Sequence, residues 1–300
     1  MNIPFKSKQI YSLALFLAFV SVVLILPLQS GKSQAAEHEN RQVYFPIVHT
    51  NARMAPVPKL QTSIRLQGAK CPNDITHNRF TDTLYIANEE SDNISIIRNG
   101  TLLDNIPTGN WPIHIQSDPN SDKVYLSHVL HGIRVLAGQS IIANIPAYGE
   151  SYTIIVNPVN GYTYITDLQR PINIIYGVEK VMDLFVPDFE GNTISWQLAT
   201  DYDPLTGLTY FASWQWRAVT VLDGTDIVDQ FSFEGEGASD MIVDPYQRTI
   251  VVANNRAFHD DKYRNNISII DMDSKKITPV VSAEFSYRVA LDKVSGYVYV

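Results

Sequence analysis

The chain has a single cysteine, Cys71, among its 300 residues, so no intrachain disulfide framework holds it together. Its charges are not gathered in blocks either. The net charge of −8 is spread along the chain, which argues against a basic nucleic-acid groove and excludes nucleic acid as the expected partner. The sequence also lacks a Gly-x-Ser-x-Gly elbow, a Gly-rich phosphate loop and a cysteine paired with a base, so no nucleophile constellation is evident.

The N-terminal residues differ from the rest. Lys6 and Lys8 precede an apolar run from Ile10 to Leu28, and small residues follow up to Ala36. This order matches a secretory signal peptide, but the run is also long enough to span a bilayer. We therefore expect residues 1–36 to be a signal peptide or an N-terminal membrane anchor. Residues 37–59 contain three prolines and are interpreted as a linker.

What the rest of the chain does contain is a repeat of roughly forty residues. Each copy has an Asp or Asn, which we call the anchor, then a short turn and a strand rich in Tyr and Val. The six anchors are Asn78, Asp118, Asn157, Asp203, Asp244 and Asp292. Repeats of this length indicate a solenoid or a propeller, and no helical periodicity supports a helical solenoid.

The second repeat shows what one unit contains. Strands are predicted at 113–117, 123–127, 132–136 and 140–145, and hairpin turns at Asn99-Gly100, Gly138 and Asp223-Gly224 close the third strand onto the fourth in three repeats. Four short meandering strands fit one propeller blade. The sequence therefore predicts an all-β fold, a β-propeller over residues 60–300 with five complete blades and a partial sixth.

Several phrases of the first repeat carry a family resemblance. Leu84 to Asn88, then Ser91 to Ile97, then Ile106 to Gly109 and Pro112 resemble the YVTN-type β-propeller repeat. The resemblance covers about residues 60–300. It is clearest in the first and fifth repeats, whereas the third and fourth lack the Asn that ends the second strand. It implies a propeller of an exported protein and fixes architecture rather than activity.

The ends of the propeller allow two interpretations. Residues 59–68 resemble a fourth strand and its exit, and Val300 ends a second strand. A six-bladed ring could borrow residues 43–48 and 60–66 for its missing strands. We favour a fragment of a seven-bladed ring, because closure normally borrows one strand. In that case the ring is open, and we expect the face of the first blade near Tyr85 to be exposed.

Candidate binding residues come from the register of the repeat. First strands line a propeller's channel, and the positions four residues before the anchors fall at its mouth; they include Asp74, His114, Asp240 and Arg288. On the same face we expect Trp214 and Trp216, and a long insertion at 255–265 that contains Tyr263 and Arg264. Carboxylates and imidazole can hold a small polar ligand or a divalent cation, but polar side chains also simply line a water-filled channel. His128 and His131, near Trp111, are a further metal candidate.

Two functions of different classes follow. The first is an exported, secreted or cell-surface binding scaffold, without a cofactor, whose loop face recognises a protein or glycan. The alternative is a metal-assisted hydrolase of the lactonase type, with Asp74 and Asp240 at the channel mouth, although the Glu and Asn partners of such a site are not evident at matching positions.

Overall fold

The computed structural model describes residues 26–27, 63–129, 132–147, 151–167, 171–187, 193–194, 197–214, 217–233, 237–254, 266–281, 286–292 and 296–300. The predicted linker 37–59, Trp216, His131 and the insertion 255–265 lie outside these ranges. Within them the fold is all-β, and the one helical element is a 3-10 turn, η1 (Glu89–Ser91). Nowhere in these ranges does a helix reach the length and apolarity that crossing a bilayer requires.

Five sheets of four antiparallel strands follow one another along the chain. The first two sheets consist of β2 (Pro72–Asn78), β3 (Thr83–Asn88), β4 (Asn93–Arg98) and β5 (Thr101–Pro107), then β6 (Pro112–Ser117), β7 (Lys123–His128), β8 (Gly132–Ala137) and β9 (Ser140–Ile145). The third and fourth consist of β10 (Ser151–Val156), β11 (Tyr162–Asp167), β12 (Ile172–Tyr176) and β13 (Glu179–Leu184), then β16 (Gln197–Tyr202), β17 (Thr209–Ser213), β18 (Ala218–Asp223) and β19 (Asp226–Ser232). The fifth consists of β20 (Ala238–Asp244), β21 (Thr249–Asn254), β22 (Asn266–Asp271) and β23 (Ile277–Val281).

Two smaller sheets complete the described structure. β24 (Ala290–Asp292) and β25 (Tyr297–Tyr299) form a sixth, partial sheet, in which β1 (Leu26–Pro27) pairs with β25. A hairpin of β14 (Val186–Pro187) and β15 (Thr193–Ile194) lies between the third and fourth sheets in the sequence. The strands predicted in the second repeat and the three hairpin turns are confirmed to within a residue or two.

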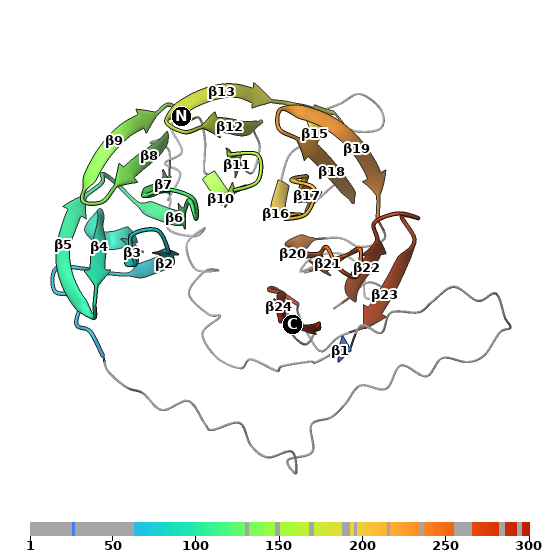
Figure 1. Ribbon diagram of the computed structural model, residues 1–300, viewed down its shortest axis with the longest axis horizontal. Coiled ribbons are helices and arrows are strands. Elements are labelled where there is room, and N and C mark those ends of the chain that lie inside the picture. Colours follow the sequence, from blue (N-terminus) through green and yellow to red (C-terminus); the bar gives the residue numbers. More distant parts are fainter. Residues whose placement is uncertain are drawn as a thin grey trace, which may run out of the picture.

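The sheets are arranged radially (Figure 1). The first strands β2, β6, β10, β16, β20 and β24 contact one another in that order, while the fourth strands lie at the periphery (Figure 1). This arrangement fits a β-propeller. The inner strands are buried along almost their whole length, as in β7, β17 and β18, because both faces of these sheets are covered by neighbouring sheets.

The hydrophobic core is divided into layers between successive sheets. The layer between the first and second sheets contains Tyr85 and Ile94 from the first sheet and Ile115 and Leu126 from the second. Four further layers repeat this packing as far as Val298 in the partial sheet. Each sheet is therefore stabilised mainly by burial of apolar surface against the next one.

The expectation that Tyr85 is exposed is wrong, because Tyr85 is fully buried against the second sheet. The opposite face of the first sheet is covered less completely: Ile86 and Ile97 on it are buried, but Ile75 is not. Ile75 there is 56% exposed, whereas Ile115, which holds the same register position in the second sheet, is 2% exposed. The first sheet thus lies at one end of the arc of sheets (Figure 1).

The expectation of a strand over residues 59–68 is also wrong for its described part. Residues 63–66 are not in a strand, and Gln67 and Gly68 form a turn. Their carbonyl oxygens accept hydrogen bonds from the side-chain amides of Asn105 and Asn93, at 2.6 and 3.2 Å. Because side chains of the first sheet satisfy this backbone, the segment lies along the sheet that follows it instead of completing another one.

The peripheral strands share an irregularity. In β5, β9, β13 and β19 one residue is skipped in the pairing with the third strand, which is a β-bulge. The skipped residues are Leu103, Ile142, Val181 and Val228, all exposed. Bulges twist an edge strand and hinder pairing with another chain. The edge strand β23 pairs with β22 without such a shift.

Candidate ligand-binding face

Hydrogen bonds between neighbouring first strands define the two ends of the arrangement. A carboxylate oxygen of Asp74 in β2 accepts the backbone N–H of Ile115 in β6 at 3.0 Å, and Thr76 Oγ1 accepts the N–H of Ser117 at 3.1 Å. Each bond joins nearly equivalent positions of two repeats, so the first strands run in the same direction. We call the end where they start the loop face and the end with the turns after them the turn face.

Asp74 and His114 are neighbours at the loop face, as the repeat register predicts. His114 Nδ1 lies 3.5 Å from Asp74 Oδ2, and both side chains are about one-third exposed. His114 lies where β6 shifts register against β7, and such bulges re-aim side chains. The other oxygen of Asp74 accepts the backbone N–H of Ile75 at 2.8 Å.

Asp240 and Arg288 form the corresponding pair between the fifth and sixth sheets. Arg288 Nη1 lies 4.0 Å from Asp240 Oδ2, and its side chain is 82% exposed. The same Asp240 oxygen accepts the N–H of Val289 at 3.0 Å, and the other accepts that of Met241 at 3.0 Å. Burial raises the pKa of Asp240, and the Val289 N–H, the Arg288 charge and the Met241 N–H oppose that shift.

These contacts give the predicted carboxylates a role that the sequence did not suggest. Both oxygens of Asp74 and of Asp240 accept backbone hydrogen bonds, one of them from the next sheet. Asp201 joins the fourth sheet to Val243 of the fifth in a similar way, at 2.7 Å. The carboxylates of Asp74, Asp201 and Asp240 therefore link neighbouring sheets by hydrogen bonds. The described ranges contain no group of three or more His, Cys, Asp or Glu side chains placed to hold a metal ion.

The remaining predicted residues are placed only in part. Trp214 follows β17 on the loop face, is partly buried, and its carbonyl accepts the N–H of Gly237 at 2.9 Å. Trp216, Tyr263 and Arg264 lie outside the described residues. The structure thus places Asp74 beside His114, Asp240 beside Arg288, and Trp214 on the same face.

Sequence reasoning missed a polar cluster in the second sheet. Arg134 Nη1 donates to Nε2 of the fully buried His128 at 3.1 Å, and Arg134 Nε donates to Asn144 at 3.0 Å. Since guanidinium groups only donate, His128 must be neutral with its proton on Nδ1. Burial lowers the pKa of Arg134. A side chain at Gly109 would come within 2.6 Å of Arg134 Nη1, so glycine is required there.

The spacing of the repeat contained a signal for this cluster. In the first sheet the equivalent positions are Asn88, Ser95 and Asn105, which form a chain of hydrogen bonds across three strands. The second sheet replaces the first two with His128 and Arg134. Alignment of the repeats shows the substitution, but not its geometry. The cluster uses Nε2 of His128 for a hydrogen bond, which does not suit a metal site there.

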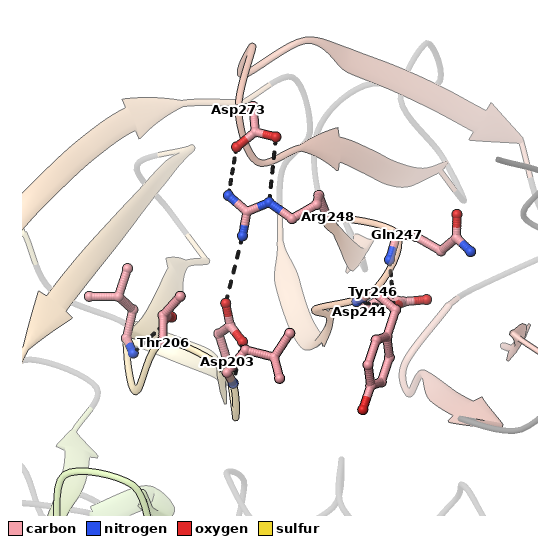
Figure 2. A network of polar contacts seen from close by, with 9 residues as sticks. Asp203, Thr206, Asp244, Tyr246, Gln247, Arg248 and Asp273 are labelled. Carbon is pink, nitrogen blue, oxygen red and sulfur yellow. Dashed lines mark hydrogen bonds and ion pairs between the residues drawn. The ribbon is translucent and has the colours of Figure 1, made fainter. Parts of the chain in front are cut away.

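A second network, shown in Figure 2, lies on the turn face between the fourth and fifth sheets. Arg248 donates two hydrogen bonds to the carboxylate of Asp273, at 2.6 and 3.4 Å, and its Nη1 lies 3.8 Å from Oδ2 of Asp203, which is fully buried. The anchor Asp244 accepts the backbone N–H groups of Tyr246 and Gln247, both at 3.0 Å. The ring of Tyr246 points away from this network (Figure 2).

Comparison with known proteins supports the fold alone. No family model matches the chain, and neither does any curated protein. Among solved structures, the hydrazine synthase of Kuenenia stuttgartiensis matches with a TM-score of 0.62 and 14% identity, over 80% of this chain and 76% of that chain. In all, 1149 solved chains match, so the architecture is widespread and does not identify an activity.

Proposed function

We propose that the chain is an exported β-propeller of the YVTN-like type that binds a protein or glycan through its loop face. One observation carries the proposal. The carboxylates that a hydrolase would use at the channel mouth, Asp74 and Asp240, are engaged by backbone N–H groups of their own and the next sheet. They support a rigid frame, which suits recognition by the loops that it carries.

We further propose that the sheets belong to a seven-bladed ring. The support is the incompletely covered face of the first sheet, where Ile75 is exposed although its counterpart in the second sheet, Ile115, is buried. A further sheet of the same repeat, placed against that face, would bury Ile75 as the first sheet buries Ile115.

Export is the third part of the proposal, and it rests on the basic, apolar and small-residue order of residues 1–36. N-terminal sequencing of the protein from fractionated cells tests it. A chain beginning near Ala36 in the soluble exported fraction would support a cleaved signal peptide. Intact residues 1–30 in a membrane pellet would support the anchor, and an uncleaved cytoplasmic protein would contradict export.

The binding proposal is tested by two double variants. Tyr263→Ala with Arg264→Ala should abolish binding on glycan and cell-envelope protein arrays without changing the melting temperature, since substitutions in a surface loop, as this insertion is predicted to be, usually shift stability by only about 0.5 kcal/mol. Asp74→Asn with Asp240→Asn should lower the melting temperature, because an amide N–H would face a backbone N–H, but should leave array binding intact.

The hydrolase alternative gives the opposite result in the same proteins. Calcium or zinc would raise the melting temperature of the wild type, and the Asp74→Asn, Asp240→Asn variant would lose that rise because hard cations depend on carboxylate charge. The readout is the metal-dependent change in melting temperature, which separates metal binding from the structural role of the carboxylates.

A further inference from the structure

The turns after the first strands share an exposed apolar side chain at one register position. Two residues after the anchor stand Phe80, Val159, Leu205 and Tyr246, which are between 50% and 71% exposed. Single exposed apolar residues are normal on soluble proteins. Four of them at the same position of four repeats are a periodic feature, and the register places all four on the turn face.

Side-chain hydrogen bonds link each of these turns to the next. Asn78 donates to the carbonyl of Ser121 at 2.9 Å, and Asn120 donates to that of Pro158 at 2.8 Å. Asn157 donates to the carbonyl of Gly207 at 2.7 Å. The Arg248–Asp203 contact continues the series into the fifth sheet (Figure 2). The turns therefore form a continuous, linked girdle from which the apolar tips project.

The second sheet has a polar residue at the tip position. Its residue at the tip position is Asn120, whose amide turns into the girdle to bond with Pro158. The third sheet adds exposed Tyr176 and Val178 from its hairpin, and the Tyr176 ring packs against that of Tyr162 with centroids 5.3 Å apart. Tyrosine combines an apolar ring with a polar end, which suits a boundary between apolar and aqueous phases.

We propose that the turn face docks onto the surface of a lipid bilayer, with Phe80, Val159, Leu205 and Tyr246 inserted into the interface. Apolar tips that recur at one register position on one face, separated by polar turn residues, suit a flat and repetitive partner better than a complementary protein surface. The N-terminal apolar run, whether signal or anchor, brings the chain to a membrane during export. This inference goes beyond the proposed function, because it concerns the opposite face; of that proposal it uses only export.

The charges of the face decide which lipid is expected. Acidic side chains outnumber basic ones in the turns and hairpins of this face: Asp82, Asp118, Asp122, Asp223, Asp226 and Asp273 accompany Arg79, Arg248 and Lys275. A face that bound anionic lipid by charge would carry a basic cluster. Docking should therefore depend on apolar insertion, occur on zwitterionic phosphatidylcholine vesicles and persist at high salt.

The experiment measures which face of the protein approaches the membrane. Vesicle binding alone would not be enough, because the N-terminal apolar run can bind vesicles without the turn face. In full-length protein with Cys71→Ser, single cysteines are introduced as Leu205→Cys or Phe185→Cys and labelled with an environment-sensitive dye. Leu205 is 61% exposed on the turn face; Phe185, 62% exposed, follows β13 at the loop face and is the matched control. Phosphatidylcholine vesicles should blue-shift the dye at 205 and reduce its quenching by iodide several-fold, and should leave the dye at 185 unchanged.

A second variant links the effect to the tips. With a dye at Val159→Cys, the additional changes Phe80→Ser, Leu205→Ser and Tyr246→Ser should abolish the vesicle-dependent protection without altering the melting temperature. Equal quenching at 205 and 185 with vesicles would overturn the proposal, as would protection at 185 alone. Protection at 205 without vesicles that grows with protein concentration would also overturn it, because it would show a second copy of the chain covering the face.

Discussion

Tyr85, Tyr125 and Tyr164 each stand seven residues after an anchor. Each hydroxyl donates to the carbonyl of a glycine in the hairpin between the third and fourth strands of the next sheet, at 3.1, 2.9 and 2.9 Å. The rings are fully or almost fully buried in the layers between sheets. The tyrosine that marks the repeat in the sequence therefore serves as a contact between sheets.

This contact gives the first prediction. Tyr125→Phe and Tyr164→Phe should each lower the free energy of unfolding by about 0.5–1.5 kcal/mol, the usual net value of one such hydrogen bond. Urea unfolding followed by circular dichroism measures it. Tyr246→Phe is the control, because that side chain is exposed on the turn face. A loss at Tyr246 as large as at Tyr125 would contradict the assignment.

Tyr210 holds the same position in the fourth sheet, and burial together with the nearby Asp203 charge raises its pKa to about 12. Burial also raises the pKa of Tyr85, Tyr125 and Tyr164. An unfolded tyrosine ionises near pH 10. The stability that Tyr210 contributes is therefore complete below about pH 10 and is lost as pH rises through its folded pKa.

The second prediction is a fall in stability between about pH 10 and 12, to which Tyr210 contributes on the order of 2 kcal/mol. Thermal melts across this range should show the fall, and Tyr210→Phe should make it shallower because Phe does not ionise. If the wild-type and variant curves stay parallel over the whole range, the environment assigned to Tyr210 is wrong.

At the scale of the sheet, Ile75 and Ile115 provide an internal comparison. They occupy the same position of the first and second sheets, but only Ile115 is buried between sheets. The third prediction is that, in the 300-residue chain without a further sheet, Ile115→Ala costs about 2–5 kcal/mol of unfolding free energy, as large-to-small changes in cores do, whereas Ile75→Ala costs less than about 0.5 kcal/mol. Chemical denaturation of both variants measures the difference.

Ile75 and Ile115 also test the proposed seven-bladed ring. If a further sheet covers the first one, Ile75→Ala will be as costly as Ile115→Ala. If the face is uncovered, Ile75→Lys should instead reduce concentration-dependent association in light scattering, because it places a charge on an exposed apolar face.

Strands and hairpins were predictable because their signals are local. Asn99-Gly100 specifies a hairpin with positive φ at both residues, and this is observed. The register predicted that Asp74, His114, Asp240 and Arg288 lie at the loop face, but not that they pair across neighbouring sheets. What the sequence could not show is the direction of hydrogen bonds between sheets, which depends on partners about forty residues away. For this reason Asp74 suggested a ligand site, and its bond to Ile115 was missed.

At the scale of the whole molecule, stability should vary along the arc. The second, third and fourth sheets pack against another sheet on both faces, whereas the first does so on one face only and leaves Ile75 exposed on the other. The fourth prediction is that hydrogen exchange protects the amides of β7 and β11 more strongly than those of β3. Native-state exchange measured by mass spectrometry tests this order. Uniform protection across all sheets would indicate a single cooperative unit.

Many side-chain bonds between sheets also share a direction, although Ser117 and Arg248 reach back to the sheet before their own. The side chains of Asn78, Tyr85 and Asp74 all reach forward to the sheet made next, and Tyr125, Asn157 and Asp240 do the same. As the chain emerges from its N-terminal end, in synthesis or in export, each sheet therefore offers its polar groups to a sheet that has not yet emerged. Assembly can proceed vectorially, one repeat at a time, with loop closures of about forty residues and little entropic cost for each. An interruption would leave one sheet with its forward-reaching side chains unsatisfied until the next sheet follows.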